Sequence, residues 1–165
     1  MGKILLIEDE GAIRNHLKEK LREKHEVKHA NNCTSAIGLW KKYYGSFDCI
    51  ILDLNILPEG LEDEEADKYF PIHGILILNK ICKEEIPDEE KWNEWKKKTQ
   101  EAKQNEIWGK TVVYSAYTEQ LKSRKKEFLP QFNYLVKLIS KEEETCVDDL
   151  LKTVNNFIMK GGNYG

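Results

Sequence analysis

The sequence predicts an α/β fold, a doubly wound parallel sheet of five strands with helices on both faces. Short apolar runs recur along the chain, and amphipathic segments of helical period separate them. The central run, 49–52, is too short for a membrane span or a stable isolated helix, so we interpret it as a buried strand. Right-handed crossovers and the strand order 2-1-3-4-5 then bring the ends of the first and third strands together.

Length and composition indicate one globular domain over residues 1–165, because the chain has 40% hydrophobic and 33% charged residues. The net charge of −3 argues against a nucleic-acid binder. No apolar run is long enough to cross a membrane and the start is unlike a signal peptide, so we expect a cytoplasmic protein. The four cysteines are widely spaced, and we expect reduced thiols.

The first half of the chain predicts three strands and two helices. Residues 3–7 form a compact β-like run, and the first helix has its apolar residues at helical spacing up to about residue 24. Residues 26–30 read as the second strand. Either Asn32 or Thr34 caps the second helix. Gly45 ends this helix before the central strand at 49–52.

Two insertions interrupt the second half. Residues 58–73 are rich in acids and predict a long loop, and 74–82 predict an apolar third helix. Within 83–108, the spacing of Trp92 and Trp95 predicts an extra helix, expected at the end of the sheet opposite the strand-end acids.

The last third returns to alternation. We expect a strand at 110–114, a charged helix at 119–129 and a fifth strand at 134–136 that ends at Lys137. A final helix, capped by Thr145, has acids in its first turn and stops at a glycine pair.

Charged and hydroxyl side chains follow these strands where each one ends. Glu8 and Asp9 follow the first strand and Asp53 the third, with Ser115 and Lys137 after the fourth and fifth. Carboxylates held close together raise one another's pKa unless a cation joins them. Mg²⁺ suits such an open oxygen cluster, and a lysine and a hydroxyl suit a phosphoryl group.

These residues resemble the motifs of a response regulator receiver domain, the flavodoxin-like module of two-component signalling. The matching motifs are Ile-Glu-Asp-Glu around Glu8 and Asp9, Ile-Leu-Asp-Leu-Asn around Asp53, Tyr-Ser-Ala around Ser115, and Tyr-Leu-Val-Lys ending at Lys137. The resemblance implies that Asp53 is the phosphorylation site and that Glu8, Asp9, Asp53 and the Asn55 carbonyl bind Mg²⁺. It also implies that Tyr134 is an aromatic switch working with Ser115.

The sequence departs from the family pattern at the two insertions and after the lysine. The family has a proline there in a cis peptide, whereas Leu138 follows Lys137. A non-proline cis bond costs about 2.5–4 kcal/mol, so we expect a trans bond.

The resemblance implies a stand-alone phosphorelay protein rather than an enzyme. A sensor histidine kinase or a histidine phosphotransfer protein would phosphorylate it. The protein would then signal to an unknown protein target, without contacting nucleic acid or membrane. The resemblance is compatible with a homodimer. Two alternatives remain: a receiver-like interaction module that is not phosphorylated, and an aspartate-nucleophile phosphatase. The phosphatase class uses a second aspartate as general acid two residues after the nucleophile, where this chain has Asn55.

Two residues are expected to set the lifetime of the phosphorylated state. By the resemblance, Asn55 and Tyr117 flank the path of the hydrolytic water. The bulk of Tyr117 should displace that water, and a misplacement of about 1 Å already costs about a hundredfold in rate. We therefore expect slow autodephosphorylation.

Overall fold

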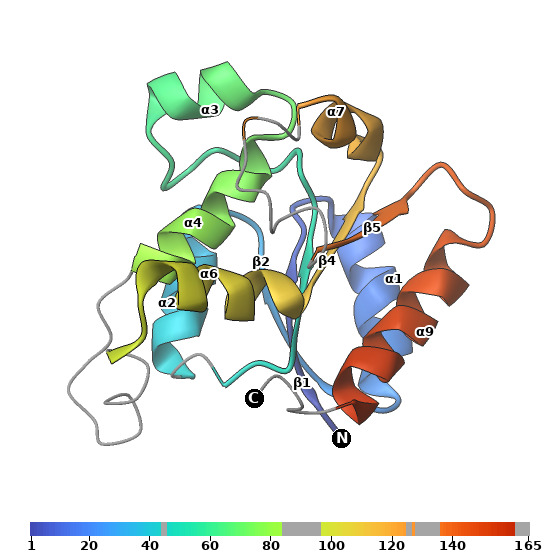
Figure 1. Cartoon of the computed structure of the whole chain (residues 1–165). Coiled ribbons are helices and arrows are strands. Elements are labelled where there is room, and N and C mark those ends of the chain that lie inside the picture. The colour runs from blue at the N-terminus through green and yellow to red at the C-terminus, as the bar shows by residue number, and fades with distance from the viewer. Residues whose placement is uncertain (44–45, 84–96, 125–126, 128–135, 161–165) are drawn as a thin grey trace.

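The computed structural model describes residues 1–43, 46–83, 97–124, 127 and 136–160 (Figure 1). Five parallel strands form one sheet in the order β2-β1-β3-β4-β5, which confirms the predicted class and order. The strands are β1 Lys3–Ile7, β2 Glu26–Ala30, β3 Cys49–Leu52, β4 Thr111–Ser115 and β5 Lys137–Ser140. Within the described part of the chain, no helix is long and apolar enough to cross a membrane.

Helices cover both faces of the sheet because the strand side chains alternate between two buried clusters. Leu5 and Ile7 of β1 belong to one cluster, and Ile4 and Leu6 belong to the other. The first cluster lies under α2 Cys33–Lys42, α4 Leu76–Lys83 and α6 Gln100–Gly109. The second lies under α1 Gly11–Arg22 and α9 Cys146–Met159, and Figure 1 shows these two helices together on that face.

The helix caps agree in part with the sequence. Asn32, rather than Thr34, caps α2: its Oδ1 accepts from the Ser35 amide at 2.8 Å, and the Ser35 hydroxyl in turn accepts from the Asn32 amide. Thr145 stands at the N-cap position of α9, but its hydroxyl donates to Asp149 Oδ2 instead of capping a backbone amide. All four cysteines are free thiols, as predicted.

The acidic segment 58–73 is not a continuous loop, so this prediction is wrong. It contains α3 Asp63–Tyr69 and is followed by the 3₁₀ turn η1 His73–Ile75, which leads into α4. Three acids lie in the first turn of α3 and a lysine in its last turn, where each favours the helix dipole. Ala66 is buried and anchors the helix. The charge density that suggested a loop therefore stabilises a helix.

The fifth strand lies later than the sequence suggested. Residues 134–136 were expected to form it, but β5 begins at Lys137, and Val112 to Ser115 of β4 pair with Lys137 to Ser140. Ile139 is buried in the cluster under α9 and fixes this register. Val136 precedes the strand, while Tyr134 and the Trp92/Trp95 pair lie outside the described residues. The charged helix predicted at 119–129 is α7 Thr118–Ser123, which ends earlier than predicted.

Candidate functional site

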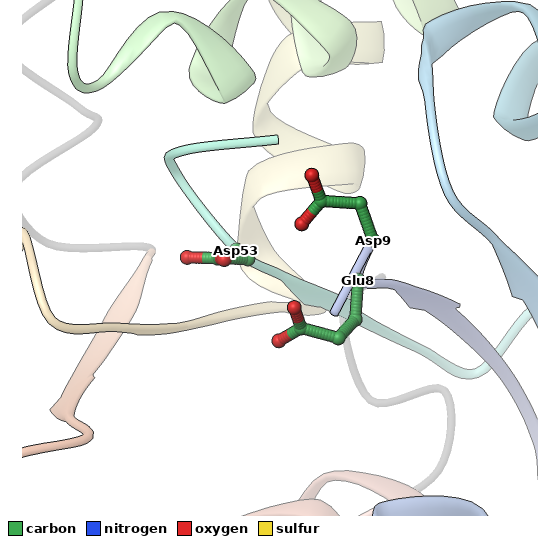
Figure 2. A group of neighbouring side chains, drawn as sticks. All are labelled: Glu8, Asp9 and Asp53. Atoms are coloured by element: carbon green, nitrogen blue, oxygen red, sulfur yellow. The ribbon is translucent and has the colours of Figure 1, made fainter. Parts of the chain in front are cut away.

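The register of β1 against its two neighbours brings three carboxylates to one edge of the sheet. Ile7 lies opposite Leu52, and the Asp53 amide donates to the Ile7 carbonyl at 3.0 Å. Glu8, Asp9 and Asp53 each offer an oxygen, and these oxygens lie within 4.8 Å of one another. Figure 2 shows the three side chains, which come from the ends of β1 and β3. The predicted acidic cluster therefore forms.

Lys141, and not Lys137, is the lysine of this cluster. Its Nζ lies 2.7 Å from Glu8 Oε2 and 3.1 Å from Asp53 Oδ2. Lys137 stands at the opposite end of β5, paired with Val112 and exposed to solvent. The placement of Lys137 in the site is wrong because β5 begins where it was expected to end. Lys141 directly follows the strand, and its amide donates to the Ser115 carbonyl at the end of β4.

The peptide bond after Lys137 lies inside β5. Among the described residues, only the Phe70–Pro71 bond is cis. The trans bond expected between Lys137 and Leu138 is therefore confirmed, and the bond after Lys141 is trans as well.

Burial and mutual repulsion shape the charges of the site. Glu8 is only 1% exposed, and the pKa of its carboxyl is raised, first by burial and then by the charge of Asp53; Lys141 opposes both effects without cancelling them. Burial lowers the pKa of Lys141, but the charges of Asp53 and Glu8 outweigh it and leave that pKa raised. The lysine therefore stays protonated beside a cluster that still carries excess negative charge.

Ser115, at the end of β4, contacts two residues next to the pocket, Leu54 beside Asp53 and Tyr117. It is fully buried, and its Oγ accepts from the Leu54 amide at 3.4 Å and from the Tyr117 amide at 3.2 Å. Both contacts use oxygen lone pairs, so the hydroxyl proton remains available to a new acceptor.

Arg14 is a site residue that the sequence analysis missed. Its Nη1 donates to the carbonyls of Glu8 and Asp9, at 3.2 and 3.0 Å. The guanidinium thereby holds the turn that carries the acidic pair. Its position one turn into a helix that follows three acids is the available sequence signal.

The cluster opens on a pocket of about 580 Å³. The pocket is lined by Asp9, Glu10, Ile13, Asp53, Asn55, Ala116, Tyr117 and Lys141. Both residues expected to flank a hydrolytic water, Asn55 and Tyr117, are therefore present, whereas the side chains of the acidic segment 58–73 are not part of this lining.

The beginning of the acidic segment is fastened to the start of α2. The Glu59 carbonyl accepts from the Cys33 amide at 3.1 Å, and its carboxylate accepts from the Asn32 side chain at 2.9 Å. Gly60 has φ +88°, and an added Cβ would lie 2.4 Å from Thr34 Oγ1. A glycine is required where the chain makes this close approach.

No protein-family model and no curated protein matches the sequence. Solved structures do match it. A CheY-like response regulator receiver domain protein of Methanospirillum hungatei has 16% identity and a TM-score of 0.60, covering 100% of this chain and 99% of that one. A response regulator receiver domain protein of Clostridium thermocellum has 19% identity and a TM-score of 0.58, covering 97% and 96%.

A third match is the response regulator TrrA of Thermotoga maritima, solved in complex with Mg²⁺-BeF. It has 23% identity and a TM-score of 0.55, and the match covers 95% of this chain and 99% of that one. At such identities the likeness concerns the fold, and the chemistry has to be argued from this chain's own residues. The chain has the fold of the response regulator receiver domains.

Proposed function

We propose that this chain is a two-component response regulator receiver that accepts a phosphoryl group on Asp53 in an Mg²⁺-dependent reaction. One observation carries the proposal: the Asp53 carboxylate lines an open pocket, with a lysine ammonium 3.1 Å away and two further carboxylates beside it. The shared fold supports it, as does the Mg²⁺-BeF complex of TrrA. The donor would be a sensor histidine kinase or a histidine phosphotransfer protein.

The residues present fit a magnesium ion. Both oxygens of Glu8 already have protein partners, since Oε1 accepts from the Glu10 amide at 3.1 Å and Oε2 accepts from Lys141. Asp9 and Asp53 line the pocket and have room for a cation. Asp9 and Asp53 would therefore bind Mg²⁺ directly, with the Asn55 carbonyl, while Glu8 acts through water. When bound, the ion neutralises charge on the phosphoryl oxygens.

The chemistry is a displacement at phosphorus. An Asp53 carboxylate oxygen attacks the phosphorus of a phosphohistidine, a P–O bond forms and the P–N bond breaks. The electron pair of the broken bond stays on the imidazole, which takes a proton from solvent. Lys141 attracts the phosphoryl oxygens, and the Ser115 hydroxyl turns its free proton toward them.

The acyl phosphate would change how the protein contacts its target. The pull on Ser115 would alter its bond with the Tyr117 amide, which begins α7. Tyr134 remains proposed as the switch aromatic that moves in response.

Incubation with a small phosphodonor and Mg²⁺, followed by intact mass measurement, tests this function. A stable adduct of one phosphoryl group supports the receiver. Absence of any adduct leaves the unphosphorylated interaction module, and phosphate release without an adduct indicates the aspartate-nucleophile phosphatase. Either of the last two results rejects the proposed function.

A further inference from the structure

Helix α7 touches two separate parts of the molecule through its two ends. Its N-cap, Tyr117, lines the pocket and donates its amide to Ser115 Oγ at 3.2 Å. Its C-cap, Arg124, contacts the inserted helix α3. Figure 1 shows α3 and α7 at the same edge of the sheet. One short helix therefore joins the pocket wall to the insertion.

The Arg124 contact has well-defined geometry. Its Nη1 donates to the Lys68 carbonyl at 3.1 Å, and the guanidinium carbon lies 4.7 Å from the centre of the Tyr69 ring. Glu127 holds the other edge of the guanidinium through two bonds of 2.8 Å. The Lys68 carbonyl lies in the last turn of α3, where helix carbonyls lack intrahelical partners. Arg124 thus completes the end of α3 from another helix.

The start of the inserted segment is fastened elsewhere. Glu59 is hydrogen-bonded to the beginning of α2 and Gly60 lies close against it, as described above. Beyond α3, the Gly74 amide donates to the Leu54 carbonyl at 2.7 Å, next to Asp53. The attachments through Glu59 and Gly74 are therefore to the body of the fold, whereas Arg124 attaches α3 to a helix that begins at the pocket.

We propose that Arg124 couples α3 to the phosphorylation pocket, so that a change at Ser115 and Tyr117 is transmitted along α7 to the C-terminal end of α3. This inference rests on the proposed function. Helix α7 has six residues and is about 9 Å long, so the movement has only this distance to cross. A hydrogen bond of 3.1 Å is lost when its atoms separate by about 0.5 Å more, so a small movement of α7 suffices.

Amide chemical shifts before and after addition of Mg²⁺ and beryllofluoride test the coupling. In the wild type, the amides of Asn55 and Ala116 should shift, and so should those of Asp67, Lys68 and Tyr69. In Arg124→Ala the pocket amides should still shift while the α3 response is lost. Lys122→Ala is the matched control, because it removes an exposed cation of α7 that pairs with Glu119 in the same helix.

A second variant approaches the contact from α3. Tyr69→Leu removes the ring under the guanidinium and should also reduce the α3 response, so the test does not depend on one substitution. The coupling is overturned if α3 is silent in the wild type while the pocket responds, or if Arg124→Ala and Tyr69→Leu respond like the wild type. If the pocket amides themselves do not shift, the proposed function fails and the coupling fails with it.

Discussion

The Lys141 ammonium bridges two carboxylates from different strands, lying 2.7 Å from Glu8 and 3.1 Å from Asp53. Its side chain is 13% exposed, so the contact is largely shielded from water. Lys141 reaches both carboxylates because β5 ends at Ser140, so that Lys141 directly follows the end of the strand. Two lysines near one strand thus have different expected roles.

Lys141→Met should slow phosphorylation of Asp53 by a small-molecule donor by about a hundredfold, because one preorganised donor to a developing charge is worth that much. Lys137→Met, at the exposed start of the same strand, should react at nearly the wild-type rate. The measurement is the time course of adduct formation by mass. The reverse order of the two variants would reject the placement of Lys141 in the site.

The raised pKa of Glu8 predicts a pH dependence of stability. Below its ordinary value of 4.5, Glu8 is protonated in both the folded and unfolded states. As the pH rises through the raised folded pKa, the unfolded chain binds fewer protons than the folded one, so stability is lost by up to about 1.4 kcal/mol per pH unit. Glu8→Gln cannot ionise and lacks this loss.

Urea unfolding of the two proteins at a series of pH values without Mg²⁺ measures the effect. The free energy of unfolding of Glu8→Gln should rise relative to the wild type between pH 4.5 and the raised pKa of Glu8 in the folded protein. At higher pH the difference should stay level. A difference that does not change with pH, or that falls, would contradict the burial of a Glu8 charge that Lys141 only partly compensates.

Tyr117→Ala should speed autodephosphorylation about tenfold, or about 1.4 kcal/mol of barrier. Tyr117 lines the same pocket as Asn55, and its ring should crowd the path of the attacking water. Ile13→Ala is the matched control, since Ile13 lines the same pocket from α1. Phosphate release from the isolated phosphoprotein measures the rate. An unchanged or slower rate of phosphate release in Tyr117→Ala would contradict the steric explanation.

Gly74→Ala should destabilise the fold by about 1–3 kcal/mol, because an added Cβ would lie 2.5 Å from the Asp53 carbonyl and 2.7 Å from the Leu54 carbonyl. Gly38→Ala is the contrasting variant. It lies within α2 with no heavy atom within 4 Å of its added Cβ, and it should stabilise by about 0.5–1 kcal/mol. Equal effects of the two changes on urea unfolding would disprove the close packing behind Asp53.

The sequence predicts most of the sheet because a buried parallel strand needs a short apolar run, and such runs are plain at β1, β3 and β4. It fails at β5, where 134–136 and 138–139 are both apolar and adjacent. The pairing of β5 with β4 and the burial of Ile139 under α9 decide between them, and both are tertiary relationships. Because the strand was expected at 134–136, the Tyr-Leu-Val-Lys motif pointed to Lys137 as the lysine at the strand end. Lys141, which directly follows the observed strand, was therefore missed.

The acidic segment was misread for a different reason. Its charges mask a helical pattern that depends on one small buried residue, Ala66. The contacts that hold it, from Glu59 to α2 and from Arg124 to α3, join positions far apart in the sequence. No local pattern predicts them. Asp53, Glu8, Asp9 and Ser115 were predictable because strand ends fix their position.

The most direct test of the central claim is phosphoryl uptake by Asp53→Asn, with Asp48→Asn as the matched control. The two aspartates flank the same strand, β3, but Asp48 lies at its other end, where its carboxylate accepts from the Lys3 amide. With a small phosphodonor and Mg²⁺, the wild type and Asp48→Asn should gain one phosphoryl group, and Asp53→Asn or addition of a chelator should abolish the gain. Uptake by Asp53→Asn at the wild-type rate would contradict the assignment of Asp53 as the acceptor.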